Sequence, residues 1–488
     1  MSNETVDTAP VLNLKPEDVE ELWEELEAYH SIYRPLFGRR EQREWSKKYL
    51  MGLLMQLPRK SVEPMVLAIE GANENAVRAM QQFISEGAWE DAVLLGQHWR
   101  EVDQDLGEAE GVLTLDGSDF HKQGKESVGV KRQYCGELGK RANCQAGVFV
   151  GYSSSHGYAL LDRRLYLPRE WVEDAVYAER RVKCGVPPAL TFKTKIELGL
   201  EMLTAIHDAN TLRCQWVMCD EGFGRDGPFL DRVAALDLWY FAEVPHDTRV
   251  WRERPAVGLP VPSAKGRKPT KERAETPPET VLDIANALSP ERWTRHTIKE
   301  GSKGPLIADF AVLRVVGVRD ELPGSDVWLV MRRSVSTGEL KTYLSNAPSD
   351  LPVDRLVWAS GMRWPIESCF EDGKQYVGLG DYEIRSWRGW HHHMTLCILA
   401  HFFLVRLAVR LKKVSVAHYS PSPDAFVTNV THLSPQSIPQ SGPCLLLATP
   451  QLACLSLPSQ TPSRHARSPT QSVAWPDLNF PYAIQVSL

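Results

Sequence analysis

The chain has 488 residues, of which 43% are hydrophobic, 24% charged and 9% aromatic, values typical of a soluble globular protein. This composition excludes a wholly disordered, collagen-like or coiled-coil chain, and the length predicts more than one domain. The formal net charge is −6, which taken alone argues against nucleic-acid binding, because phosphate recognition depends on lysine and arginine.

Neither an export signal nor a membrane span is predicted. The first thirty residues carry nine acidic side chains against Lys15, and the longest apolar run, residues 394–409, is shorter than the roughly 20 residues that cross a bilayer. The nine cysteines include no C-x-x-C pair with zinc-ligand or redox spacing. We therefore expect a cytoplasmic protein with reduced thiols and no membrane partner.

The N-terminal part is predicted to be helical. From Lys15 to Trp99 the apolar residues recur at helical spacing. Residues 31–60 reverse the acidic charge that precedes them with eight basic side chains: Arg34, Arg39, Arg40, Arg43, Lys47, Lys48, Arg59 and Lys60. We expect residues 1–105 to form a helical DNA-binding domain, although this basic stretch could equally be a solvated helix face.

From residue 112 the pattern changes to short runs rich in β-branched and aromatic residues. Four successive strands are predicted, which would form an antiparallel meander, at residues 112–115, 127–134, 144–150 and 158–166. Two helices and two strands follow, at residues 193–208, 214–219, 228–236 and 239–244. Residues 106–245 are therefore expected to form the first part of a mixed α/β core.

Beyond residue 245 the composition changes again. Residues 252–280 are rich in proline and charge, and strand patterns return between 306 and 345, so we expect a β-rich insertion with a basic linker over residues 246–353. Helices at about 362–377 and 390–411 would complete the core over residues 354–412. The tail, residues 413–488, holds eleven of the 33 prolines and is expected to be poorly ordered.

Carboxylates follow two of the predicted core strands. Asp116 comes directly after residues 112–115, and Asp220 directly after the strand that ends at Cys219. A carboxylate is costly to bury unless it is paired or metal-bound, although either residue alone could be a helix cap or a turn residue. A third carboxylate, Glu367, lies in a predicted helix on which positions 363, 367, 371 and 374 share one face, as they also would in an ordinary ion-paired surface helix.

These motifs resemble those of a known family. Arg363, Glu367 and Lys374 match the R-x3-E-x6-K core of the signature in DDE transposases of bacterial insertion sequences, the branch whose ribonuclease H-like catalytic core is interrupted by a β-strand insertion. Further blocks resemble the same family at residues 115–124, 127–145 and 220–226. The resemblance extends over about residues 40–410 and leaves out the tail.

The resemblance implies an α/β fold in which a ribonuclease H-like mixed sheet is flanked by helices. It implies that Asp116, Asp220 and Glu367 are catalytic and hold two Mg²⁺ (or Mn²⁺) ions, and that Arg363 and Lys374 contact DNA phosphate. The expected partners are DNA, as terminal inverted repeats and as target, and a second copy of the chain in a homodimeric synaptic complex. The expected activity is DNA cleavage and strand transfer for cut-and-paste mobility.

Departures from the family pattern leave alternatives open. Ser360 stands where the signature usually has a tyrosine, and the first block reads Asp116-Gly117-Ser118-Asp119-Phe120 in place of Asp-Asp/Glu-Thr-Gly-Phe, which makes Asp119 a rival to Asp116. The alternatives to a transposase are an inactive copy that still binds repeat DNA and a ribonuclease H-like nuclease without strand transfer. A zinc site at residues 391–393 is disfavoured, because three consecutive histidines on a helix point in different directions.

Overall fold

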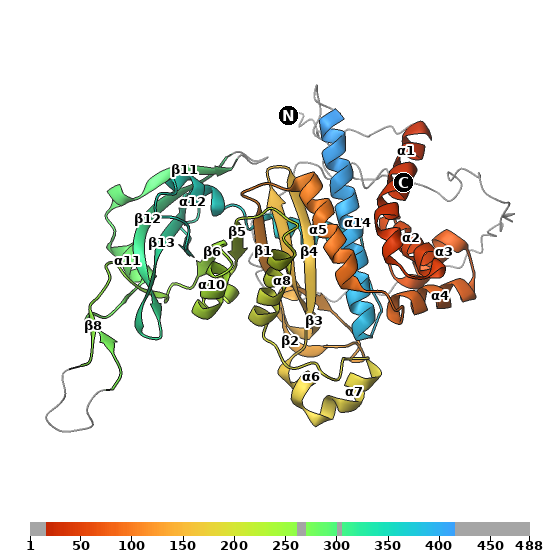
Figure 1. Ribbon diagram of the computed structural model, residues 1–488, viewed down its shortest axis with the longest axis horizontal. Helices are drawn as coiled ribbons and strands as arrows, with labels where there is room; N and C mark the ends of the chain where they lie inside the picture. Colours follow the sequence, from red (N-terminus) through yellow and green to blue (C-terminus); the bar gives the residue numbers. More distant parts are fainter. Residues whose placement is uncertain (1–15, 261–269, 300–304, 415–488) are drawn as a thin grey trace, which may run out of the picture.

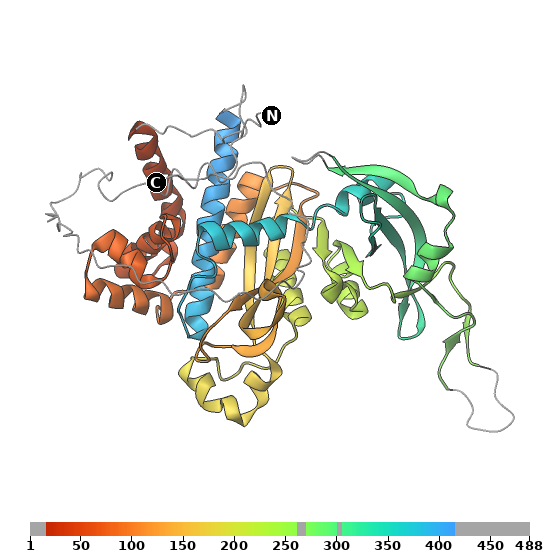
Figure 2. The same ribbon diagram turned by 180° about the vertical axis from the view of Figure 1, so that it is seen from behind.

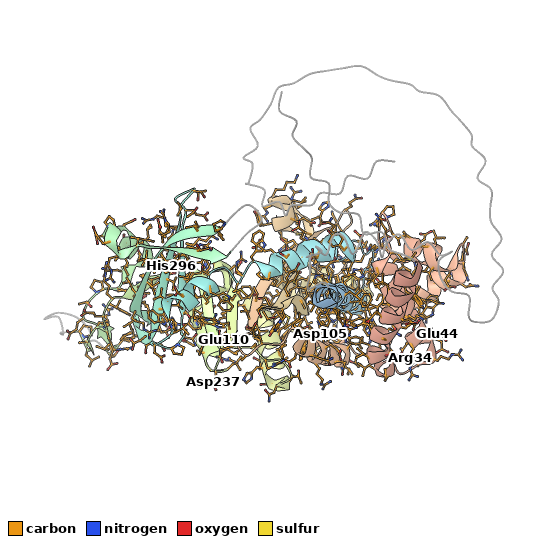
Figure 3. The ribbon with its side chains drawn as sticks, turned by 90° about the horizontal axis from the view of Figure 1, so that it is seen from above. Arg34, Glu44, Asp105, Glu110, Asp237 and His296 are labelled. Carbon is orange, nitrogen blue, oxygen red and sulfur yellow. The ribbon has the colours of Figure 1, made fainter. Side chains whose placement is uncertain are left out.

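The computed structural model describes residues 16–260, 270–299 and 305–414. Figure 1 shows the N-terminal helices, a central sheet with helices against it, and a second β-rich part lying in a row along the longest axis. In the view from above, Arg34 lies near one end of this row and His296 toward the other (Figure 3). The central sheet therefore separates the N-terminal helices from the β-rich insertion.

The described N-terminal residues form helices packed around one another. Asn73 begins one of them by accepting a hydrogen bond from the backbone N–H of Ala76, and that helix buries Met80, Phe83 and Ile84. The helices are α1 (Pro16–Tyr33), α2 (Arg40–Leu54), α3 (Val62–Glu70), α4 (Glu74–Ser85) and α5 (Asp91–Leu106).

Much of the basic stretch at residues 31–60 is engaged inside the protein. Lys60 is buried, and its ammonium donates to the carbonyl oxygens of Leu53 and Tyr376. Four further side chains form ion pairs, which are Arg40–Glu44, Lys47–Glu27, Lys48–Glu70 and Arg59–Glu383. Arg34 and Arg39 are exposed and form no ion pair with any residue in the described ranges. These contacts favour the solvated-face interpretation for most of the stretch.

The central sheet is mixed and confirms the predicted α/β fold class. Its strand order is β4-β3-β1-β5-β6, in which β3 is antiparallel to both β1 and β4, while β5 and β6 continue parallel to β1. This is the ribonuclease H-like arrangement that the sequence predicts. The strands are β1 (Val112–His121), β3 (Lys140–Ser154), β4 (Gly157–Tyr166), β5 (Trp216–Cys219) and β6 (Trp239–Val244).

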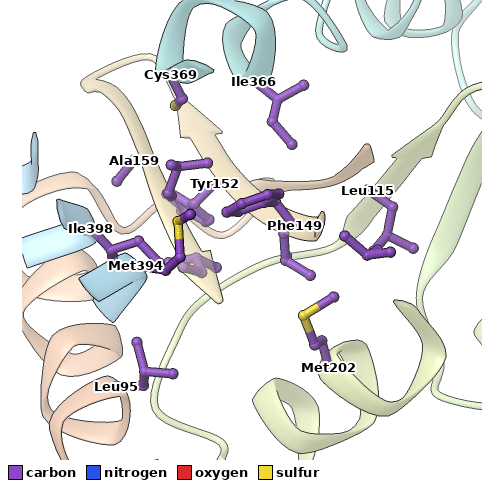
Figure 4. Packing of buried hydrophobic residues seen from close by; sticks show 14 of the residues in the cluster. Leu95, Leu115, Phe149, Tyr152, Ala159, Met202, Ile366, Cys369, Met394 and Ile398 are labelled. Carbon is purple, nitrogen blue, oxygen red and sulfur yellow. The ribbon is translucent and has the colours of Figure 1, made fainter. Parts of the chain in front are cut away.

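Helices cover both faces of this sheet. Figure 1 shows α8 (Lys195–Ala209) on one face, and Figure 2 shows α13 (Pro365–Tyr376) crossing the other face. In Figure 4, Ile366 of α13 lies on one side of the sheet residue Phe149, and Met202 of α8 lies on the other. All three side chains are fully or almost fully buried. The core therefore fixes the position of α13 against the sheet.

Several elements differ from those predicted. The first strand does not end at residue 115 but continues to His121, because it pairs with β3 along its whole length. The strand predicted at 127–134 is confined to β2 (Lys131–Cys135), which pairs with the first residues of β3. The sequence pattern also does not predict the short helices α6 (Arg169–Glu173), α7 (Ala178–Lys183) and α9 (Glu221–Gly224), whereas α10 (Gly227–Ala234) was expected.

The insertion is β-rich in its described residues, and its strands continue the central sheet. Strand β14 pairs with β6, so the described strands make one sheet of 12 strands together with a separate two-stranded ribbon. Residues 261–269 of the predicted basic linker lie outside the described residues. The elements are β7 (Arg249–Trp251), β8 (Val257–Gly258), β9 (Arg273–Ala274), β10 (Glu279–Thr280), α11 (Val281–Ala287), β11 (Thr294–Lys299), β12 (Leu306–Arg319), β13 (Leu322–Ser334), β14 (Leu340–Ser345) and α12 (Val353–Ala359).

The last described helix, α14 (Trp387–Val414), runs through the middle of the protein between the sheet and the N-terminal helices (Figure 1). Within it, the stretch Trp387–Arg410 is long and apolar enough to cross a membrane by composition alone, but 89% of its most apolar window is buried inside the fold. This burial is typical of a core helix. The predicted tail lies outside the described residues apart from its first two positions.

Candidate active site

Two of the predicted carboxylates lie side by side on neighbouring parallel strands. Leu115 of β1 pairs with Cys219 of β5, so Asp116 and Asp220 are the next residues of two strands that run about 4.8 Å apart. The sequence predicted Asp116 at the end of a strand, but it lies in the middle of β1, where it pairs with Phe149. Phe149 packs against Phe370 of α13, so the side chain of Asp116 faces that helix.

Asp220 also serves as a helix cap. Its carboxylate oxygen accepts a hydrogen bond from the backbone N–H of Phe223 at 3.3 Å and so begins α9. The cap interpretation and the site interpretation are therefore both compatible with its position. The cap fixes the carboxylate beside the end of β5.

The third carboxylate reaches the same place from α13. The guanidinium of Arg363 donates to the Asp116 carboxylate at 2.7 Å and to the Glu367 carboxylate at 2.8 Å. Arg363 precedes the helix, which begins at Pro365, so the prediction that it lies on the helix itself is wrong. The side chain of Asp116 is 16% exposed and that of Glu367 36% exposed, so solvent reaches the pair from one side.

The electrostatics place a dense group of charges around Arg363. The pKa of Asp116 is raised to about 6, mainly by burial; the positive charge of Arg363 lowers it, and the negative charges of Asp220 and Glu367 add to the rise. Burial lowers the pKa of Arg363, but the carboxylates of Asp116, Glu367, Glu243 and Asp220 outweigh burial and raise it overall. Each of the three predicted carboxylates therefore interacts with the same guanidinium.

Lys374 and Asp119 lie farther along α13 and β1, respectively. The Lys374 ammonium donates to the backbone oxygen of Asp119 at 3.3 Å and forms an ion pair with Glu137 at 3.4 Å. The Asp119 carboxylate accepts a hydrogen bond from the backbone N–H of Gly136 at 2.6 Å and so holds the turn after β2. Asp119 is thus engaged in a local structural contact, which favours Asp116 as the carboxylate that joins Asp220 and Glu367.

Glu243 is a fourth carboxylate that the sequence reasoning missed. Cys219 of β5 pairs with Ala242 of β6, so Glu243 continues the row formed by Asp116 and Asp220. It forms an ion pair with Lys341 at 3.1 Å and has a side chain 19% exposed. The predicted strand at 239–244 carries this carboxylate near its C-terminal end, but only its pairing with β5 places Glu243 beside Asp220.

The donor chemistry suits hard divalent cations, although the side chains do not form a ready-made cage. Within the described residues, no three histidine, cysteine or acidic side chains are grouped so as to hold a metal ion. Instead, the guanidinium of Arg363 lies between Asp116 and Glu367. Carboxylate oxygens are the protein ligands that Mg²⁺ prefers.

The three consecutive histidines have structural roles. Each bonds to a different neighbour: His391 to the Trp387 carbonyl, His392 to the carbonyls of Ile84 and Trp89, and His393 to the Tyr49 hydroxyl. Burial lowers the pKa of His391 and His393 to about 3 and that of His392 to about 4. A hollow of about 890 Å³ beside His391 and His392 contains none of the five predicted site residues.

Comparison with known proteins gives one family. A family model described as DDE superfamily endonuclease matches residues 33–305, a range that includes Asp116 and Asp220 and ends before Glu367. No curated protein matches the chain.

Two solved structures share a weak likeness with the chain. One is the cryo-EM structure of the piggyBac transposase synaptic complex with hairpin DNA, with 11% identity, a TM-score of 0.40, and coverage of 86% of this chain and 80% of that one. The other is the crystal structure of the NurA nuclease from Sulfolobus solfataricus, with 10% identity, a TM-score of 0.25, and coverage of 58% and 86%. Neither likeness is close enough to support an argument about function. The family model, in contrast, matches more than half of the chain, and the protein therefore belongs to the DDE superfamily endonuclease family.

Proposed function

We propose that the protein is a DNA transposase that cleaves and rejoins DNA at the ends of an insertion sequence, in a cut-and-paste reaction. The observation that carries this proposal is the convergence of Asp116, Asp220 and Glu367 on Arg363 from two adjacent strands and a helix. The family match supports DNA cleavage, and the sequence motifs support the transposase class.

In this proposal Asp116, Asp220 and Glu367 hold two Mg²⁺ (or Mn²⁺) ions. When bound, such ions activate the attacking oxygen and stabilise the leaving oxygen of a phosphodiester. Once the guanidinium of Arg363 has left the carboxylates, it binds the phosphate at the cut, because a guanidinium donates to phosphate and to carboxylate with the same fork geometry. Lys374, at the other end of α13, binds a phosphate farther along the strand.

We further propose that the partners are terminal inverted repeats, target DNA and a second copy of the chain in a synaptic complex. The N-terminal helices offer the exposed Arg34 and Arg39 for the repeat DNA. Such a protein acts in the cytoplasm of its host cell, where the DNA is accessible.

The test is a nicking and joining assay on the DNA that flanks the reading frame. The wild-type protein should nick one strand at an element end in Mg²⁺ and then join the freed 3′-hydroxyl to a second duplex. Asp220→Asn should abolish both products, whereas Asp350→Asn, at an exposed position outside the candidate site, should leave them unchanged.

The alternatives give other outcomes in the same assay. A nuclease without strand transfer would cleave and give no joined product. An inactive copy would bind the repeat DNA and give neither product. Cleavage that survives Asp220→Asn would overturn the proposed site.

A further inference from the structure

The two-stranded hairpin formed by β2 and the start of β3 presents an exposed face of arginine and tyrosine. Tyr134 lies directly opposite Arg141, and Arg132 lies opposite Asn143. Paired residues of antiparallel strands point to the same face, and so do residues two apart on one strand, so these four side chains share a face. Tyr134 is 65% exposed, which is unusual for a large aromatic side chain.

The opposite face of the hairpin is packed against the protein. Cys135 and Cys144 on that face are fully buried, and the thiol of Cys144 lies near the carbonyl of Tyr134. Lys131, which also points to that face, is neutralised by an ion pair with Glu170. Because the inner face of the hairpin is packed against the protein, the face with the arginines and the tyrosine points to solvent.

Apart from Lys131, the basic residues of this hairpin form no ion pair with any described residue. Arg132, Lys140 and Arg141 are exposed and form no ion pair with any residue in the described part of the chain. Residues 131–143 carry four basic side chains and one acidic side chain, in a chain whose net charge is −6. Unpaired arginines around an exposed aromatic ring suit a polyanion that also offers flat rings to stack.

The hairpin is joined to the candidate active site. Its turn receives the Asp119 carboxylate through the backbone N–H of Gly136, and Lys374 forms an ion pair with Glu137 in that turn. Lys374 lies seven residues after Glu367 on α13, which corresponds to roughly 10 Å along the helix. The hairpin therefore begins about this far from the carboxylates, and Figure 1 shows β2 at the lower end of the central sheet.

We propose that this face binds the single-stranded DNA that leaves the candidate active site, with Arg132 and Arg141 on its phosphates and Tyr134 stacked on a base. This inference rests on the proposed function. The contacts begin roughly 10 Å from the cut phosphate, which is the distance along α13 from Glu367 to Lys374. Because the hairpin strand from Gly136 to Arg132 adds roughly 13 Å, they extend to roughly 23 Å from it.

The experiment measures binding of labelled DNA to the full-length protein by fluorescence anisotropy in EDTA, over a series of salt concentrations. The probes are a blunt duplex and the same duplex with a single-stranded thymidine arm of about ten nucleotides. Tyr134→Ala should weaken binding of the armed duplex about tenfold, while Tyr134→Phe, which keeps the ring, should bind like wild type. The double variant Arg132→Gln/Arg141→Gln should lower the slope of log affinity against log salt by about 1.4.

The matched control is Arg232→Gln/Arg292→Gln, which removes two exposed arginines on α10 and in the insertion that also form no ion pair with described residues. This control should keep both the affinity and the salt slope. Wild-type affinity for the armed duplex in Tyr134→Ala and in the Arg132/Arg141 double variant would overturn the inference while leaving the proposed function intact. A wild-type protein that binds neither probe would overturn the proposed function itself.

Discussion

Asp116→Asn should stabilise the metal-free protein at pH 8. Burial first, and then the charges of Asp220 and Glu367, raise the pKa of Asp116 from 3.8 to about 6. Above that pH the Asp116 carboxylate is ionised in both the folded and the unfolded protein, but ionisation is less favourable in the folded protein. The free energy of unfolding is therefore lower by about 3 kcal/mol, because one pKa unit corresponds to about 1.4 kcal/mol. The cost is fully present above the folded pKa, declines as the pH falls, and is absent below 3.8. Asparagine keeps the shape of the side chain and removes the charge.

The assay is urea unfolding in EDTA, with the wild type and the variant compared at pH 8 and at pH 5. The variant should gain up to about 3 kcal/mol at pH 8 and about half of that at pH 5, because the folded protein is then mostly protonated at Asp116. Asp350→Asn, at an exposed position without an ion pair to the described residues, should give no such difference. A variant less stable than wild type at pH 8 would refute the reasoning, because Asp116 would then act mainly as the partner of Arg363.

Three further perturbations test the surroundings of the site. Arg363→Gln should raise the affinity of the DNA-free protein for Mn²⁺ by about tenfold in isothermal titration calorimetry. The variant lacks the guanidinium that bridges the carboxylates of Asp116 and Glu367, so both are free to bind the ion. Weaker Mn²⁺ binding by the variant would contradict this prediction. Lowering the pH from 7 to 5 should reduce the free energy of unfolding. Burial lowers the pKa of His391, His392 and His393 to about 3, 4 and 3, so over this interval these side chains take up protons only in the unfolded chain. A free energy of unfolding in urea that does not change between pH 7 and pH 5 would contradict this prediction. Ile366→Ala should cost about 2–5 kcal/mol, since this side chain of α13 is 1% exposed; a negligible loss in thermal unfolding would show that the helix is anchored elsewhere.

The sequence predicted the regular elements of the core well where the apolar pattern is strong. The predicted strand at 239–244 coincides with β6, and the predicted helix at 193–208 differs from α8 by two residues at its start and one at its end. The same pattern predicted that Asp116 and Asp220 each follow a core strand, but only the structure shows that these two strands are neighbours.

Local pattern was insufficient where long-range pairing decides the structure. Residues 116–121 contain aspartate, glycine and serine, which favour turns, yet β1 continues through them because β3 pairs with every one. The role of Glu243 depends on the register between β5 and β6, which no single strand reveals. The bridge from Arg363 to Asp116 joins residues far apart in the chain, so only the fold could show it.

The measurement that tests the central claim most directly is Mn²⁺ binding followed by electron paramagnetic resonance. We predict that Asp116→Asn, Asp220→Asn and Glu367→Gln each lower the affinity for the same bound Mn²⁺ ions by about tenfold or more. Glu371→Gln, on the same helix and exposed, should bind like wild type. If any one of the first three variants keeps wild-type affinity and stoichiometry, the three carboxylates do not form one metal site.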